Sequence, residues 1–158
     1  MTKLYATHGM IGSGKTTFSK KFCADNKILR FNHDDIMITL YGDNPPKEMF
    51  QEYVKGIDRL LESLTKNLLR NGQDVFLDLG LFEKKSRDFW RKIAKECEAE
   101  FIIYFIDCPK EIALQRTLQR TKEMPDGALR IDENAFNIIN KRIEPLEENE
   151  KYIKINGA

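Results

Sequence analysis

Residues 9–16 read GMIGSGKT, a complete phosphate-binding P-loop of the pattern G-x-x-x-x-G-K-[ST]. Glycines in such a loop let backbone N–H groups approach phosphate oxygens, because no Cβ stands in the way. Lys15 is expected to reach the β- and γ-phosphates, and the Thr16 hydroxyl to hold Mg²⁺. The pattern therefore predicts an ATP and Mg²⁺ site formed by Gly9, Met10, Ile11, Gly12, Ser13, Gly14, Lys15, Thr16 and Thr17.

The motif stands in the context that a P-loop needs, between a strand and a helix. Residues 4–8 form a short β-compatible run that ends at the loop, and Phe18, Phe22 and Cys23 recur at helical spacing after it. The N-terminus of that helix adds unpaired N–H groups and the positive end of the helix dipole. A chance match is therefore the weaker interpretation.

Two adjacent carboxylates, Asp34 and Asp35, follow the second predicted strand. A carboxylate in this place could accept the proton of a substrate hydroxyl, or it could cap the helix that follows. Neighbouring residues can take one role each. We expect both to contact the substrate, with Asp34 preferred as the catalytic base and Asp35 as the alternative.

Asp78 ends the third predicted strand, inside the apolar run VFLDLGL. A carboxylate there can hold a metal-bound water or a substrate group, as a Walker-B aspartate does. The alternative is a strand-end residue that bonds local backbone. We predict a substrate- or metal-binding role for Asp78.

Arg116 and Arg120 are four residues apart on a predicted helix, so they share one face. They lead into residues 121–131, which contain Pro125-Asp126-Gly127 and are expected to form a short lid. Two arginines at the base of a lid are suited to binding nucleotide phosphates as charge shifts during transfer. The alternative is a pair of solvated surface arginines.

These side chains require a scaffold that brings them together. Hydrophobic patterning predicts strands at 4–8, 28–32, 75–79, 101–106 and 151–155, and helices at 14–25, 34–41, 47–69, 85–98, 110–120 and 132–143. The alternation predicts an α/β fold, a parallel sheet with helices on both faces. Ligands of such folds bind at the carboxyl ends of the strands, where the P-loop and the aspartates above lie.

The composition limits the class of protein. A length of 158 residues favours a single domain, here 1–158. The 26 Lys and Arg balance 25 Asp and Glu, so no strong field attracts nucleic acid or an anionic membrane. Three widely spaced cysteines without a C-x-x-C pair argue against a zinc ribbon and suit a cytoplasmic location. No apolar run reaches the length of a membrane span.

The combination of GMIGSGKT, NHDD after the second strand, VFLDLGL and LQRTLQR resembles the small P-loop kinases. The most similar subgroup holds the kinase domain of phage polynucleotide kinase and chloramphenicol phosphotransferase, and the resemblance covers nearly the whole chain. It implies a three-layer P-loop NTPase fold with strand order 2-3-1-4-5. It also implies Asp34 as the general base, Asp78 as a substrate- or metal-site carboxylate, and Arg116 and Arg120 as lid arginines.

One position departs from the subgroup. Polynucleotide kinases typically carry an arginine three residues after the base, where this chain has Met37. An uncharged side chain cannot bind a substrate phosphate, so a nucleic-acid end is disfavoured and a small-molecule hydroxyl acceptor is preferred.

The sequence thus predicts an ATP-dependent kinase that phosphorylates a hydroxyl group. The alternatives are a polynucleotide 5′-hydroxyl kinase and a non-kinase nucleotide-binding ATPase or regulatory module. A GTPase would carry N-K-x-D, and Asn26-Lys27-Ile28-Leu29 lacks the aspartate. The acceptor and the oligomeric state stay open.

Overall fold

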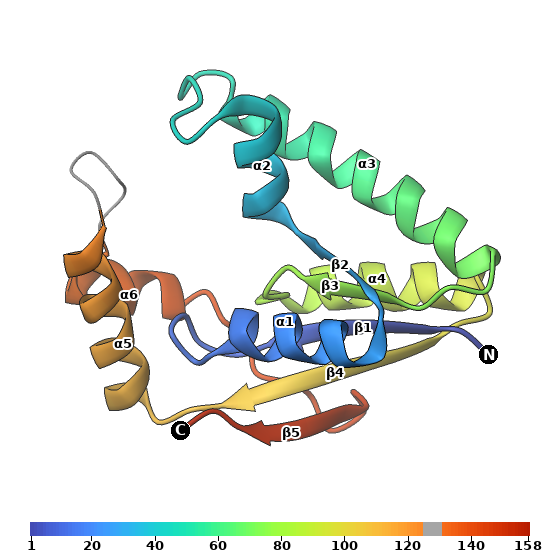
Figure 1. Ribbon diagram of the computed structural model, residues 1–158. Coiled ribbons are helices and arrows are strands. Elements are labelled where there is room, and N and C mark those ends of the chain that lie inside the picture. The colour runs from blue at the N-terminus through green and yellow to red at the C-terminus, as the bar shows by residue number, and fades with distance from the viewer. Residues whose placement is uncertain (125–130) are drawn as a thin grey trace.

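The strands form one parallel sheet in the order that the resemblance implied. The computed structural model describes residues 1–124 and 131–158. Its sheet consists of β1 (Lys3–His8), β2 (Leu29–Asn32), β3 (Val75–Asp78), β4 (Glu100–Asp107) and β5 (Tyr152–Asn156). Their order is β2-β3-β1-β4-β5, and each neighbouring pair is parallel (Figure 1). The predicted P-loop NTPase fold is confirmed.

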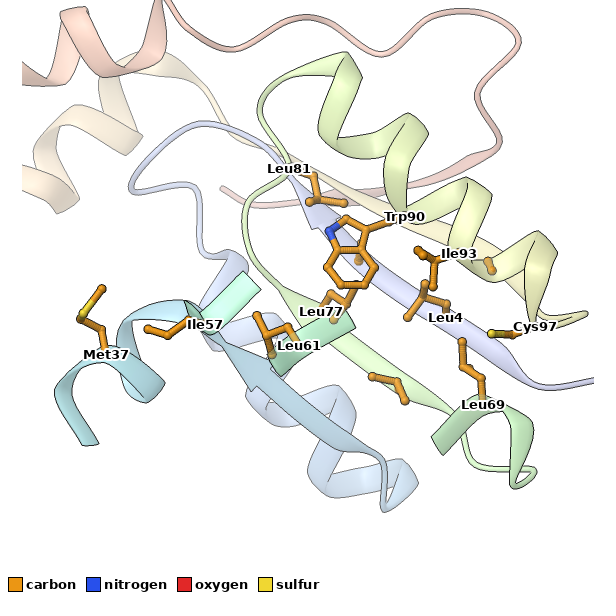
Figure 2. Packing of buried hydrophobic residues seen from close by; sticks show 13 residues of the cluster. Leu4, Met37, Ile57, Leu61, Leu69, Leu77, Leu81, Trp90, Ile93 and Cys97 are labelled. Carbon is orange, nitrogen blue, oxygen red and sulfur yellow. The ribbon is translucent and has the colours of Figure 1, made fainter. Parts of the chain in front are cut away.

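Helices cover both faces of this sheet. The described helices are α1 (Lys15–Asn26), α2 (His33–Tyr41), α3 (Phe50–Arg70), α4 (Lys84–Glu96), α5 (Lys110–Glu123) and α6 (Glu133–Asn140). The side chains of α3 and α4 pack on one face of β1 and β3, as Figure 2 shows for Leu61, Trp90 and Leu77. On the other face, Phe18 and Phe22 of α1 pack on aromatic side chains of the sheet. Because both faces are covered, β3 is buried along its whole length, as its apolar sequence predicts.

Helices α5 and α6 lie at the carboxyl edge of the sheet, beside the P-loop (Figure 1). Their shared core contains Cys108, Ala113 and Phe136, and the P-loop residues Met10 and Ile11 pack against it. This small cluster fixes the P-loop to the helix that carries the two arginines.

Some predicted helix ends were wrong. The helix expected at 110–120 continues to Glu123, three residues into the predicted lid, because Thr121, Lys122 and Glu123 contain no helix breaker. It ends at Met124, which precedes a proline and has an extended conformation, as such residues prefer. The rest of the lid prediction falls largely on residues 125–130, outside the described part of the chain.

A buried ion pair joins α4 to the segment before β5. Arg87 and Glu150 are 0% and 4% exposed, and the guanidinium donates from Nε and Nη2 to the two carboxylate oxygens at 2.7 and 3.0 Å. Burial alone would raise the pKa of Glu150. Hydrogen bonds from Arg87, the Glu147 amide and Arg91 outweigh it and lower this pKa from 4.5 to about 2.

This shift predicts a loss of stability in acid. A carboxylate whose pKa is lower in the folded state stabilises the fold above its unfolded pKa, and the contribution disappears as the pH falls. As the pH falls from 4.5 to 2, we expect protonation of Glu150 to lower the free energy of unfolding by roughly 3 kcal/mol. Urea unfolding at a series of pH values measures this loss.

Glu150→Gln should be less stable at neutral pH and should lack this part of the pH dependence. Glu148→Gln, which changes an exposed residue, should behave like the wild type. An equal acid slope in Glu150→Gln would contradict the assignment.

Candidate active site

A cleft of about 1010 Å³ lies at the carboxyl edge of the sheet. The P-loop and the first turn of α1, the start of α2, the end of β3 with the following loop, and α5 all line it. Predicted site residues on its surface are Ile11, Gly12, Gly14, Lys15, Thr16, Thr17, Asp34, Asp78, Arg116 and Arg120. The predicted residues outside its lining are Gly9, Met10, Ser13 and Asp35. The structure therefore brings most of the expected machinery into one cavity.

Two glycines give the P-loop its shape. Gly14 has φ 101°, a left-handed conformation, and α1 begins directly after it without a side-chain cap. The first amides of α1 are thus left for a ligand at the cleft, as in anion sites at helix N-termini. Gly12, at φ 79°, lies so close to α5 that a Cβ would collide with the Ala113 carbonyl and the Thr117 hydroxyl.

Lys15 is held against its own loop. Its Nζ donates to the carbonyl oxygens of Gly9 at 2.8 Å and Met10 at 2.6 Å, and lies 5.3 Å from the ring centre of Phe82. Burial lowers the pKa of Lys15 from 10.5 to about 8; the carboxylate of Asp78 opposes this shift and Arg120 adds to it. A nucleotide phosphate would replace the two carbonyls with a full negative charge.

ATP binding is expected to take up protons near pH 8. A bound phosphate raises the pKa of Lys15. At pH 8 Lys15 is neutral in about half of the free protein molecules, and in these molecules it takes up a proton when ATP binds. The affinity for ATP should fall as the pH rises further. Calorimetric titrations in two buffers of different ionisation heat measure the uptake. Arginine stays protonated, so Lys15→Arg should lack this component; equal uptake in that variant would assign the proton to another group.

The sequence analysis missed Arg30, which joins two of the predicted aspartates. Its Nη2 and Nε lie 2.6 and 3.1 Å from Oδ2 of Asp78, and its Nη1 lies 3.0 Å from Oδ2 of Asp35. Asp78 also accepts hydrogen bonds from the hydroxyls of Ser19 at 2.8 Å and Thr7 at 3.2 Å. Asp78 is thus a buried carboxylate at the base of the cleft, held by two hydroxyls and by an arginine that it shares with Asp35.

The two adjacent aspartates differ in surroundings. Asn32 caps α2, its side chain accepting the Asp35 amide at 3.0 Å, so the capping role that we considered for the aspartates belongs to Asn32. Asp35 is paired with Arg30 outside the cleft lining, whereas Asp34 is exposed on the cleft surface. Of the pair, Asp34 is the carboxylate that a substrate in the cleft can reach.

Both predicted arginines of α5 face the cleft. Arg116 Nη1 lies 3.5 Å from the Ser13 carbonyl and also donates to the Gly157 carbonyl, so the end of the chain meets the P-loop here. Arg120 lines the same cavity one turn further along α5. Two guanidinium groups beside the P-loop can neutralise phosphate charge.

The remaining loop residues have structural roles in this state. Met10 and Ile11 pack against the α5–α6 core, and the Ile11 amide donates to Asn140 at 3.1 Å. Ser13 is fully buried, whereas Thr16 and Thr17 are exposed at the cleft. The predicted contacts of these residues with nucleotide remain predictions.

The donor set fits Mg²⁺ bound together with a nucleotide. No group of three or more His, Cys, Asp or Glu side chains in the described residues could hold a metal ion by itself. Mg²⁺, however, commonly binds through one or two protein oxygens, water and substrate phosphates. Thr16 offers its hydroxyl at the cleft, whereas Asp78 would have to exchange an internal hydrogen bond for a direct metal bond.

Met37 does not line the cleft. Its side chain is 6% exposed and belongs to the core on the inner side of α2, beside Ile57 of α3 (Figure 2). In this chain the position three residues after Asp34 therefore packs α2 onto α3. The absence of an arginine at position 37 leaves the cleft without a cation from that position, and the methionine side chain itself is not part of the cleft lining.

A glycine loop after β1 and a parallel sheet ordered 2-3-1-4-5 define a P-loop fold of the kinase type. The chain belongs to the family described as AAA domain, which it matches over residues 4–146, and within it to the small P-loop kinases. None of the described helices is both long enough and apolar enough to cross a membrane.

Known proteins agree with this assignment. The chain is 28% identical over 127 residues to L-seryl-tRNA(Sec) kinase of Methanococcus maripaludis, covering 77% of this chain and 48% of the relative. It therefore spans about half the length of this curated relative. Its fold matches Chaetomium thermophilum Kti12 in complex with ADP-AlF3 (TM-score 0.72, 15% identity, 97% and 88% of the two chains). It also matches a gluconokinase from Sinorhizobium meliloti (TM-score 0.65, 14% identity, 99% and 83%). At these identities the structures indicate the fold alone.

Proposed function

We propose that the protein transfers the γ-phosphate of ATP to a hydroxyl group of a small-molecule acceptor. The observation that carries this proposal is the shared cleft, in which Asp34 accompanies the P-loop lysine and the two arginines of α5. Phosphoryl transfer needs this combination of a phosphate site, cations and a group that orients the nucleophile. A nucleotide-binding regulatory module would not need the carboxylate.

Each of these residues has a defined task in the proposed reaction. The Asp34 carboxylate accepts the proton of the acceptor hydroxyl, whose oxygen attacks the γ-phosphorus while the bond to the β-phosphate oxygen breaks and ADP leaves. Lys15 leaves the carbonyls of its own loop and binds the β- and γ-phosphates. Arg116 and Arg120 bind developing charge on the phosphates. When bound, Mg²⁺ supplies further neutralisation, with the Thr16 hydroxyl as its expected protein ligand and Asp78 nearby.

The charges around Asp34 favour an acceptor without a negative charge. Arg30 pairs with both Asp35 and Asp78, so one positive charge faces two carboxylates, and the described cleft residues at 32–34 and 79–82 include neither lysine nor arginine. The segment 33–70, which carries α2 and α3, has seven acidic and five basic residues. The segment thus offers no excess of positive charge to bind phosphate groups, which disfavours a polynucleotide end as the acceptor.

The sequence similarity supports a second candidate, a seryl group carried by tRNA. The curated relative is by name an L-seryl-tRNA(Sec) kinase, but this chain corresponds to about half of its length. A seryl hydroxyl would suit the site beside Asp34. The segment 33–70 has no excess of positive charge that would favour close contact with tRNA phosphates there.

A transfer screen with γ-labelled ATP tests the proposal. The acceptors are polyols, amino alcohols, hydroxy acids, nucleosides, oligonucleotide 5′ ends and seryl-tRNA, with Lys15→Ala as the blank. We expect label on a small neutral or cationic hydroxyl compound. Label on seryl-tRNA alone would support the second candidate, and ADP release without any labelled acceptor would favour the ATPase alternative.

A further inference from the structure

We propose that Arg87 is a positioning residue for the cleft: it fixes residues 79–82, the loop that lines the cleft after β3, to the segment 144–150. The kinetic test of this proposal rests on the function proposed above, whereas the structural test, which follows Trp90 emission, does not. Arg87 itself lies on α4, outside the cleft lining, and is completely buried.

The guanidinium of Arg87 acts on backbone as well as on Glu150. Its Nη1 donates to the carbonyl oxygens of Leu81, Phe82 and Glu144, each at 3.2 Å, and its Nη2 donates to that of Pro145 at 3.1 Å. The same guanidinium thus binds two segments that are more than sixty residues apart. Glu150 orients the guanidinium by accepting its other donors.

The loop held in this way forms part of the site. Leu79, Gly80 and Phe82 line the cleft, and the Phe82 ring lies against Lys15 Nζ. The Leu81 carbonyl, one of the acceptors of Arg87, also lies 3.1 Å from His8 Nδ1, directly before the P-loop. A displacement of the 81–82 backbone would therefore reach both the phosphate lysine and the acceptor side of the cleft.

The segment after α6 meets the loop at the same place. The Glu144 amide donates to the Phe82 carbonyl at 2.9 Å, and the Lys84 amide donates to Glu144 Oε2 at 2.9 Å. The buried Arg87 donates to the carbonyl oxygens of both Phe82 and Glu144 at this junction. Helix α6 also contacts the P-loop through Asn140, so the junction ties the described part of the α5–α6 region to the cleft floor.

Lysine cannot replace arginine here, because an ammonium has three donors and no planar fork, whereas the guanidinium has five N–H groups in fixed directions. Arg87→Lys keeps the charge opposite Glu150 but loses most of the carbonyl contacts. Arg91 provides the matched control: it lies one turn further along α4 and donates to the same Glu150 at 2.8 Å. Among the described residues its hydrogen-bond partners are the side chains of Asp88 and Glu150, not a loop carbonyl.

The experiment compares Arg87→Lys, Arg91→Met and the double variant Arg87→Met with Glu150→Leu. The double variant removes the buried charges together, a change that is often tolerated in stability, and keeps the test independent of an unpaired charge. Steady-state constants are measured well below each melting temperature, with Trp90 emission as a second readout, because Trp90 packs beside Leu81 in the core (Figure 2).

We expect Arg87→Lys and the double variant to lower kcat/KM for the acceptor by about tenfold or more, mainly through KM, and to shift Trp90 emission. Arg91→Met should stay within about twofold of the wild type. Lower melting temperatures with unchanged constants and unchanged emission would overturn the proposal and leave Arg87 a purely stabilising residue. If the wild type phosphorylates no acceptor, the proposed function fails, and the Trp90 emission alone decides whether Arg87 orders the loop.

Discussion

Replacing Lys15 by alanine should reduce phosphoryl transfer by about 10²- to 10³-fold and weaken ATP binding. The lysine is the P-loop cation that we expect to bind the β- and γ-phosphates, and removing one preorganised donor of this kind commonly costs 10²- to 10³-fold. In the free protein its Nζ is bound to the Gly9 and Met10 carbonyls, so the loop must reorganise around the phosphates. Initial rates with labelled ATP and calorimetric affinity measure the two effects.

Lys20→Ala is the matched control for this experiment. Lys20 lies on the same helix, α1, is exposed, and does not line the cleft. It should leave both rate and affinity within about twofold of the wild type. Unchanged turnover in Lys15→Ala would refute the assignment of residues 9–16 as the phosphate site.

Asp34→Asn should lower the rate of transfer by about 10²-fold or more while ATP affinity changes little. The asparagine amide has nearly the shape of the aspartate carboxylate, but it cannot take up the proton of the substrate hydroxyl. The neighbouring Asp35→Asn removes a negative charge of the same size from a residue outside the cleft lining. It should cost only a few-fold, through the lost ion pair with Arg30.

The comparison of the two asparagine variants identifies the base. Full activity in Asp34→Asn, or a larger loss in Asp35→Asn, would remove Asp34 from the catalytic role. Equal ATP affinities in both variants would show that the nucleotide site is intact.

The order of strands and helices was predictable because each element has a local signal. The P-loop octet marks the end of β1 and the start of α1, and the apolar runs 75–79 and 101–106 mark β3 and β4. Helix ends were harder to predict, since propensity changes gradually over residues such as those at 121–123. The strand order came from the resemblance, because local pattern does not say which strands pair.

The candidate site was predictable where a polar side chain follows a strand end, and for Arg116 and Arg120 where two arginines share one helix face before a predicted lid. Asp34, Asp78 and the P-loop satisfy the first of these conditions, and the structure brings them to one cleft. Arg30 was missed because its partner Asp78 is 48 residues away, although one signal existed: an arginine inside a strand, two residues before Asn32, which pairs with Asp78 in register.

Arg87 shows the same limit more strongly. Its place on the apolar face of α4, three residues before Trp90 and seven before Ala94, is a signal that it is buried, but its partner Glu150 is 63 residues away and could not be read from the sequence. Met37 shows the reverse error: a position judged by its family neighbours as substrate-facing turns inward, because α2 needs an apolar contact with α3.

The close seating of Gly12 on α5 has an evolutionary consequence. Because a Cβ at position 12 would meet the Ala113 backbone as well as the Thr117 side chain, no single side-chain change on α5 can make room for it. The P-loop pattern allows any residue at position 12, but in this protein only glycine should be accepted there as long as α5 stays where it is. In relatives with a larger residue at position 12, the helix that corresponds to α5 should be displaced or should begin at a different residue. Residue 12 and this helix would therefore have to change together in evolution.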